Sequence, residues 1–136
     1  MSSQLNVDTI VDKAGSGGTN VKIGNTSTYV SDGGSATQNT VQALAKTWIQ
    51  FNGTGTIATQ DSFGVGSLTD NNTGNYSIGF ANNMANNDYA NAGIGNTAGM
   101  SSEAVTTSAL NALTFNSSGS NNDVTIVSAI IHGDLA

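Results

Sequence analysis

The sequence predicts an all-β chain, with an antiparallel β-sandwich head behind an N-terminal β-hairpin arm. Short segments of alternating apolar and polar residues recur over residues 46–133, separated by clusters of Asn, Asp and Gly. The chain has 18 Asn, 16 Ser, 17 Thr and 17 Gly, half of its 136 residues, but only 9% charged residues and no Pro. Such a chain leaves sheet edges open to pairing with neighbours. We therefore expect an intertwined homo-oligomer.

Composition and charge exclude several classes of protein. Three Lys, no Arg and a net charge of −6 cannot form the basic surface that a nucleic-acid partner requires. No segment reaches the ~20 apolar residues that span a bilayer, so we expect no membrane insertion. The first residues show no signal peptide. Without Cys, the chain has no disulfide and no thiolate site.

Residues 1–30 are expected to form the arm, a hairpin over about residues 4–24 that is interrupted by the Gly-rich segment 14–18. A two-stranded hairpin is marginal in water, so the arm should pair with other chains. Residues 31–45 are expected to be a linker that ends in a short helix, because Val41, Leu44 and Ala45 have helical spacing. The apolar candidates for attachment to other proteins or for subunit contact are Leu5, Val7, Ile10, Val21, Ile23, Val41 and Leu44.

The head, residues 46–136, is expected to contain six strands. They are placed at about 47–51, 63–69, 76–80, 89–95, 105–115 and 124–131; the fifth is ambiguous between strand and helix, and strand is favoured. The last segment is apolar on both faces, which indicates a central strand or a subunit contact. The expected core comprises Ile49, Phe51, Phe63, Val65, Ile78, Phe80, Ile94, Phe115, Val124, Ile126 and Ile130.

Catalytic and metal chemistry are not indicated, and we expect no cofactor. His132 is the only histidine; Asp134 is too close along a strand to orient it, and Asp123 would have to approach by tertiary folding. Residues 70–74 faintly resemble a calcium loop, but Ala81 stands where the bidentate Glu belongs. A hairpin turn explains the same residues better.

Aromatic residues raise one binding hypothesis. Trp48 lies opposite the expected core face, and Tyr29, Tyr76 and Tyr89 are expected to be exposed. Rings surrounded by Asn and Asp can stack on sugars. The favoured alternative is that Trp48 packs against the short helix or a neighbouring subunit.

Three segments resemble fibre and appendage proteins of marine bacteriophages. QLNVDTIVDKAGSGG is similar to their L-x-V-D-T-I-x-D-x-x-G segment, AKTWIQFNGTGTIATQDSFGVGSLTDNNTGNYSIGF to the distal domain of their tail fibres, and VTIVSAIIHGD to the closing strand of that domain. The chain departs from the pattern at Gln60, at His132 and in NNMANNDYA, which stands where a Pro-containing loop is usual.

The resemblance implies a non-enzymatic virion protein, a homotrimeric tail fibre or fibre tip. The arm would bind other virion proteins, and the loops of the head would contact a glycan or protein of the host surface. The candidate contact residues are Asn71, Asn72, Asn75, Asn86, Asn87, Asp88, Tyr89, Asn121 and Asn122.

Two rival functions stay open. A capsid decoration protein, which stabilises the head of the virion, would use the same architecture. A tip that hydrolyses polysaccharide would need paired acids, and its candidates are Asp61, Asp70, Asp88 and Glu103.

Overall fold

The computed structural model describes residue 23 and residues 27–30, 34–97, 99–103 and 105–136, and this part of the chain is all-β. It contains no helix long and apolar enough to span a bilayer. The chain divides into two compact units, Met1–Val41 and Gln42–Ala136. Of the expected arm hairpin, Leu5, Val7, Ile10 and Val21 lie outside the described residues.

In the first unit, β1 (Thr28–Val30) pairs antiparallel with β2 (Thr37–Asn39). The pairing continues beyond the strands, because the Thr40 N–H donates to the Ser27 carbonyl at 2.9 Å. The linker expected over residues 31–45 thus contains a strand. The short helix was a wrong prediction, since residues 40–43 form a turn. A helix of two turns has little stability of its own, and β pairing takes up its first residues.

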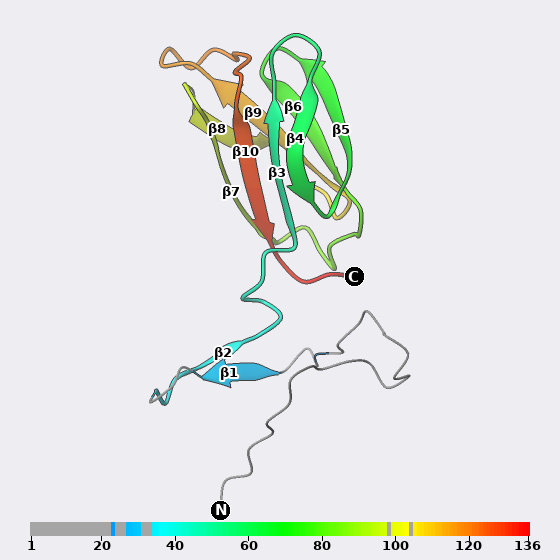
Figure 1. The fold of residues 1–136 in the computed structure, drawn as a ribbon, viewed down its shortest axis with the longest axis vertical. Helices are drawn as coiled ribbons and strands as arrows, with labels where there is room; N and C mark the ends of the chain where they lie inside the picture. The colour runs from blue at the N-terminus through cyan, green and yellow to red at the C-terminus, as the bar shows by residue number, and fades with distance from the viewer. Residues whose placement is uncertain (1–22, 24–26, 31–33, 98, 104) are drawn as a thin grey trace, which may run out of the picture. The chain divides into compact units, whose positions relative to one another are not determined.

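The second unit contains two four-stranded antiparallel sheets, with strand orders β4-β3-β10-β7 and β5-β6-β9-β8. Figure 1 shows them as two layers. The strands are β3 (Thr47–Asn52), β4 (Ala58–Phe63), β5 (Val65–Asn72), β6 (Asn75–Phe80), β7 (Ala90–Gly95), β8 (Gly99–Glu103), β9 (Ala109–Phe115) and β10 (Val127–His132).

One core joins the two sheets. Alternate residues of β3, β6, β9 and β10 are buried, as period-2 strands with one inward face require. The buried apolar residues are Ile49, Phe51, Tyr76, Ile78, Phe80, Met84, Tyr89, Leu110, Ala112, Val124, Val127, Ala129 and Ile131. The unit is therefore sandwich-like.

Several expected core residues lie on the surface instead. Phe63, Ile94, Ile126 and Ile130 are exposed, whereas Val65 and Phe115 are half-buried. In the last apolar segment the alternation of buried and exposed residues shifts by one position. Val124 is buried ahead of the strand, but within β10 the buried residues are Val127, Ala129 and Ile131. Sequence alternation alone does not reveal that shift of one residue.

The expected strands of the head correspond to β3, β5, β6, β7, β9 and β10, and β10 is central as expected. The ambiguous segment is a strand from Ala109 onward. Two strands were missed, β4 and β8, which are both sheet edges. Their residues are mostly exposed and polar, so they carry no apolar alternation to detect.

The placement of β9 predicts a contrast between two leucines on its opposite faces. Leu110 is fully buried and Leu113 is half-buried on the outer face. Leu110→Ala should lower the free energy of unfolding by about 2–5 kcal/mol, because it leaves a cavity in the core. Leu113→Ala, the matched control, should cost less than half as much. Urea unfolding followed by circular dichroism measures both, and equal losses would contradict this inward face.

Candidate functional site

The outer face of the β4-β3-β10-β7 sheet carries a continuous line of apolar side chains. The strand register places Phe63 opposite Trp48, Trp48 opposite Ile130, and Ile130 opposite Ala92. Residues directly opposite on neighbouring strands have Cβ atoms ~4.5–5.5 Å apart, so these four residues form one row across the sheet. We call Phe63, Trp48, Ile130 and Ala92 the apolar row.

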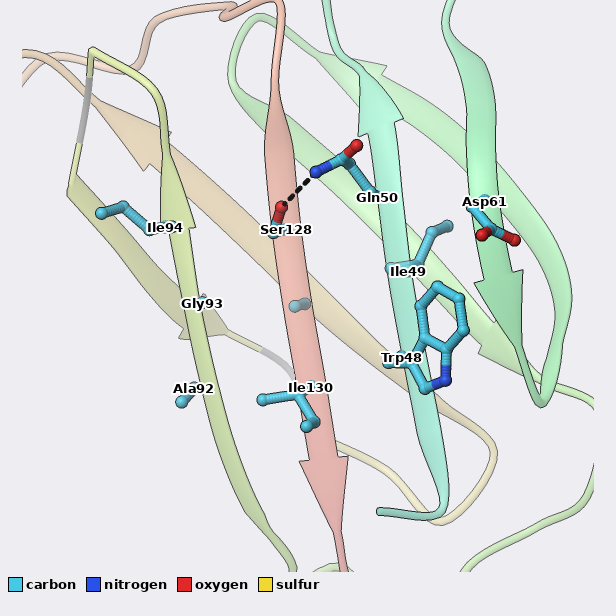
Figure 2. A pocket seen from close by; sticks show the side chains of 10 residues that line it. Trp48, Ile49, Gln50, Asp61, Ala92, Gly93, Ile94, Ser128 and Ile130 are labelled. Atoms are coloured by element: carbon cyan, nitrogen blue, oxygen red, sulfur yellow. Dashed lines mark hydrogen bonds between the residues drawn. The ribbon is translucent and has the colours of Figure 1, made fainter.

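A second line, the mixed row, runs beside it and consists of Asp61, Gln50, Ser128 and Ile94. The Gln50 side-chain amide donates to the Ser128 hydroxyl at 3.3 Å, as the dashed line in Figure 2 marks. All residues of the two rows except Phe63 line a shallow depression of about 670 Å³. Of the apolar side chains in the rows, Phe63 is 59% exposed and Ile94 is 65% exposed.

The outer face of the β5-β6-β9-β8 sheet is different in kind. There the Asn71 amide donates to the Ser77 hydroxyl at 2.8 Å and to Asn75 Oδ1 at 3.1 Å. The Ser77 hydroxyl in turn donates to Asn111 Oδ1 at 2.7 Å. This polar ladder crosses β5, β6 and β9 and suits contact with water. The two outer faces of the unit are therefore not equivalent.

A buried tyrosine holds together the loops at one end of the two sheets. The Tyr76 hydroxyl lies 2.9 Å from the Gly53 carbonyl oxygen and 2.9 Å from Asp123 Oδ1, and Asp123 also accepts the Gly74 N–H at 2.6 Å. We call Gly53, Gly74, Tyr76 and Asp123 the Tyr76 node. Among the described residues, every buried side-chain nitrogen or oxygen has a hydrogen-bond partner.

Both glycines of the node are required by its geometry. A Cβ on Gly53 would lie 2.5 Å from the Tyr76 hydroxyl oxygen. Gly74 has a φ of 63°, which favours glycine, and closes the turn between β5 and β6. The turn cluster of residues 70–74 thus forms a hairpin, as expected from the sequence.

Two tyrosines expected on the surface are buried instead. Tyr76 is fully buried, and its ring packs edge-to-face on Phe51 with centroids 5.0 Å apart. The Tyr89 hydroxyl lies 3.0 Å from the carbonyl oxygens of Thr106 and Ala109. Tyr89 is therefore no candidate for host contact. Both rings fill the core while their hydroxyls bond within it.

The other predicted contact residues separate into two groups. One group adjoins the Tyr76 node and consists of Asn71, Asn72, Asn75, Asn121 and Asn122. The last two lie there because the Asn122 N–H donates to the Thr114 carbonyl, and the Thr114 N–H donates to the Gly74 carbonyl. Asn86, Asn87 and Asp88 lie at the other end, in the β6–β7 connection, where the Ala85 N–H donates to the Asp134 carbonyl. The Gln42 side chain, where the unit begins, also reaches Asp134, at 3.4 Å.

Three of the candidates for attachment are among the described residues. Ile23 and Leu44 are exposed and Val41 is half-buried, and the division between the units falls directly after Val41. Sequence reasoning missed the apolar row because it assigned Phe63 and Ile130 to the core. The outward position of Trp48 was the available signal, since its strand partners must share its face.

The described residues contain no group of three His, Cys, Asp or Glu side chains that could hold a metal ion. His132 lines a small cleft of about 290 Å³ with Asp88 and Asp134, whereas Asp123 belongs to the Tyr76 node at the opposite end. The acids considered for hydrolysis stand on separate elements, with Asp61 on β4, Asp70 on β5, Asp88 in a connection and Glu103 on β8.

Burial, together with the hydrogen bond and the negative charge of Asp123, raises the pKa of Tyr76 from 10.0 to about 12. Above pH 10 the unfolded chain releases this proton while the folded chain keeps it. The stabilisation is complete below pH 10 and is lost as the pH rises towards 12. Burial also raises the pKa of Tyr89.

Tyr76→Phe should therefore lower the free energy of unfolding at neutral pH by about 1–3 kcal/mol, since Asp123 and the Gly53 carbonyl lose a donor. The variant should also lose less stability than the wild type between pH 10 and 12. Urea unfolding across this pH range measures both effects, with Tyr29→Phe, in the other unit, as the control. An alkaline loss identical to that of the wild type would refute the role given to the phenol.

No family model, curated protein or solved structure matches the chain.

Proposed function

We propose that the chain is a non-enzymatic structural protein of a bacteriophage virion, a trimeric fibre or fibre tip. Its N-terminal arm would attach it to the particle, and its C-terminal head would contact the host surface. The head is residues 46–136, most of the sandwich-like unit. A stable, loop-bearing β framework is the kind of scaffold on which binding loops are usually carried.

The observation that carries this proposal is the Tyr76 node. The motifs that resemble fibre tips include F-N-G-T-G and T-G-x-Y, which lie about twenty residues apart in the sequence. Gly53 comes from the first motif, and Gly74 and Tyr76 come from the second. In the structure the Tyr76 hydroxyl is within hydrogen-bond distance of both the Gly53 carbonyl oxygen and Asp123, and Asp123 also accepts the Gly74 N–H. The motif residues thus share one structural task, which supports a common head architecture.

The geometry also supports a choice among the contact loops. The unit begins at Gln42, beside Asp134 and the β6–β7 connection. If the arm holds the particle, the loops at the opposite end of this unit are the ones farthest from Gln42, the residue at which the arm joins it. We therefore assign host contact to residues 71–75 and 116–122, and not to Asn86, Asn87 and Asp88.

Removal of residues 1–30 should leave a folded head that no longer joins the particle. Antibody against the head should label the tail of wild-type virions and leave virions carrying the truncated chain unlabelled. Circular dichroism of the truncated chain provides the control for folding. Regular labelling over the capsid would instead favour the decoration protein, and full labelling without the arm would contradict the assigned attachment.

The double variant Asn72→Ala/Asn121→Ala should slow adsorption of the phage to its host about tenfold, because each lost hydrogen bond is worth ~0.5–1.5 kcal/mol. Both side chains are exposed. The matched control is Asn86→Ala/Asn87→Ala, at the other end of the unit, which should adsorb at the wild-type rate. Counts of unadsorbed phage over time measure the rates. The reverse pattern would overturn the assignment of the loops.

A further inference from the structure

We propose that the outer face of the β4-β3-β10-β7 sheet, formed by the apolar and mixed rows, is the surface through which heads bind copies of themselves. In the trimer this face would turn towards the threefold axis. The inference deepens the proposed function, on whose trimer it rests, and differs from the contacts expected at residues such as Val41 and Leu44.

The first argument is the difference between the two outer faces. The polar ladder of Asn71, Ser77 and Asn111 presents hydrogen-bonding groups to water. On the other sheet, Phe63, Ile94 and Ile130 are exposed at 59%, 65% and 39%. Trp48 connects Phe63 to Ile130 across the strands, and Ile94 is diagonal to Ile130 on the same face. A contiguous exposed apolar patch typically marks an interaction site.

Charge favours a second copy as the occupant. Each chain has a net charge of −6, so close contact between copies is favoured where a face carries few charges. The two rows contain a single formal charge, Asp61, and it stands on the edge strand β4. Like-charged chains can therefore approach closely at this face. Its central polar pair, Gln50 and Ser128, already shares a hydrogen bond, which lowers the cost of covering it.

The sizes of the side chains fit a closed ring. Along the apolar row they decrease from Phe63 and Trp48 on one half of the sheet to Ile130 and Ala92 on the other. Figure 2 shows Trp48, Ile130 and Ala92 of this row. When three such faces surround an axis, the β4-β3 half of one copy meets the β10-β7 half of the next. Large side chains then pack against smaller ones at each contact, and a head-to-tail contact of this kind forms a closed ring where its rotation closes, as it does around a threefold axis.

The area of the face is sufficient for the core of an interface. Each of its four strands is six residues long. With ~4.8 Å between strands and ~3.3 Å per residue, the face covers ~400 Å² in projection. In the ring, half of this area, ~200 Å², faces each neighbour. A standard interface buries ~800 Å² per partner, so each half supplies the apolar core of a contact and the residues around it supply the polar rim.

The structure reduces the number of candidates for what packs against Trp48. Packing on a short helix is excluded, because residues 40–43 form a turn. A sugar and a neighbouring subunit are left. Sugar-binding faces combine an aromatic ring with several free polar groups, whereas here the strand partners of the ring are Phe63 and Ile130, and the Gln50 amide on the same face is bonded to Ser128.

The test uses the full chain and the variant Ile94→Asp, which adds a charge at a strongly exposed position and so spares the fold. Light scattering should give three times 13.7 kDa for the wild type and a mass falling towards 13.7 kDa for the variant. The matched control is Thr69→Asp, also at an exposed position but on the outer face of the other sheet, where Thr69 pairs with Ser77; it should keep the wild-type mass. Circular dichroism checks that all three proteins are folded.

The fluorescence of Trp48 gives an independent measurement, because Trp48 is the only tryptophan of the chain. A neutral quencher should reduce this fluorescence weakly in the wild type and strongly in Ile94→Asp, even where arm residues keep the copies together. The inference is overturned if mass and quenching are the same in the variant as in the wild type. It is also overturned if a monomeric wild type shields Trp48 only after host polysaccharide is added. Neither result changes the labelling of virions, which tests the proposed function separately.

Discussion

The buried hydroxyl of Tyr76 is the contact on which the arrangement of the head depends most. It comes from β6 of one sheet, meets the Gly53 carbonyl that follows β3 of the other sheet, and shares Asp123 with the turn at Gly74. A low-charge core has few such polar fixed points, and an unsatisfied buried hydroxyl would be costly. The node therefore sets how the two sheets meet and holds in place the loops that surround it.

The functional reasoning follows from the inequality of the two outer faces. The outer face of one sheet carries a ladder of amides and hydroxyls that bond to one another. The outer face of the other sheet carries a row of uncovered apolar side chains. In a chain that relies on Asn, Ser and Thr for its solubility, an uncovered apolar row is costly unless something packs against it. Assembly through one face and recognition through loops at one end would then be separate tasks on one small framework.

Sequence reasoning succeeded where the local pattern and the final environment agree. The β5–β6 hairpin is an example, because Asn, Asp and Gly over residues 70–74 favour a turn and Ile78 and Phe80 alternate towards the core. It failed where the environment is set by distant residues. The edge strands β4 and β8 are each held by pairing with one neighbouring strand. Tyr76 and Tyr89 can be buried because carbonyls and a carboxylate distant in the sequence accept hydrogen bonds from their hydroxyls.

By itself, the sequence determined an all-β, charge-poor chain with a central last strand and an outward-facing Trp48, because alternation and turn residues are local properties. Only the tertiary structure decided which face of each strand lies inside. Ile130 and Ile131 are adjacent and chemically identical, yet one is exposed and the other is fully buried. A shift of one residue before β10 exchanges the two faces, and that register is determined by pairing with β3 and β7.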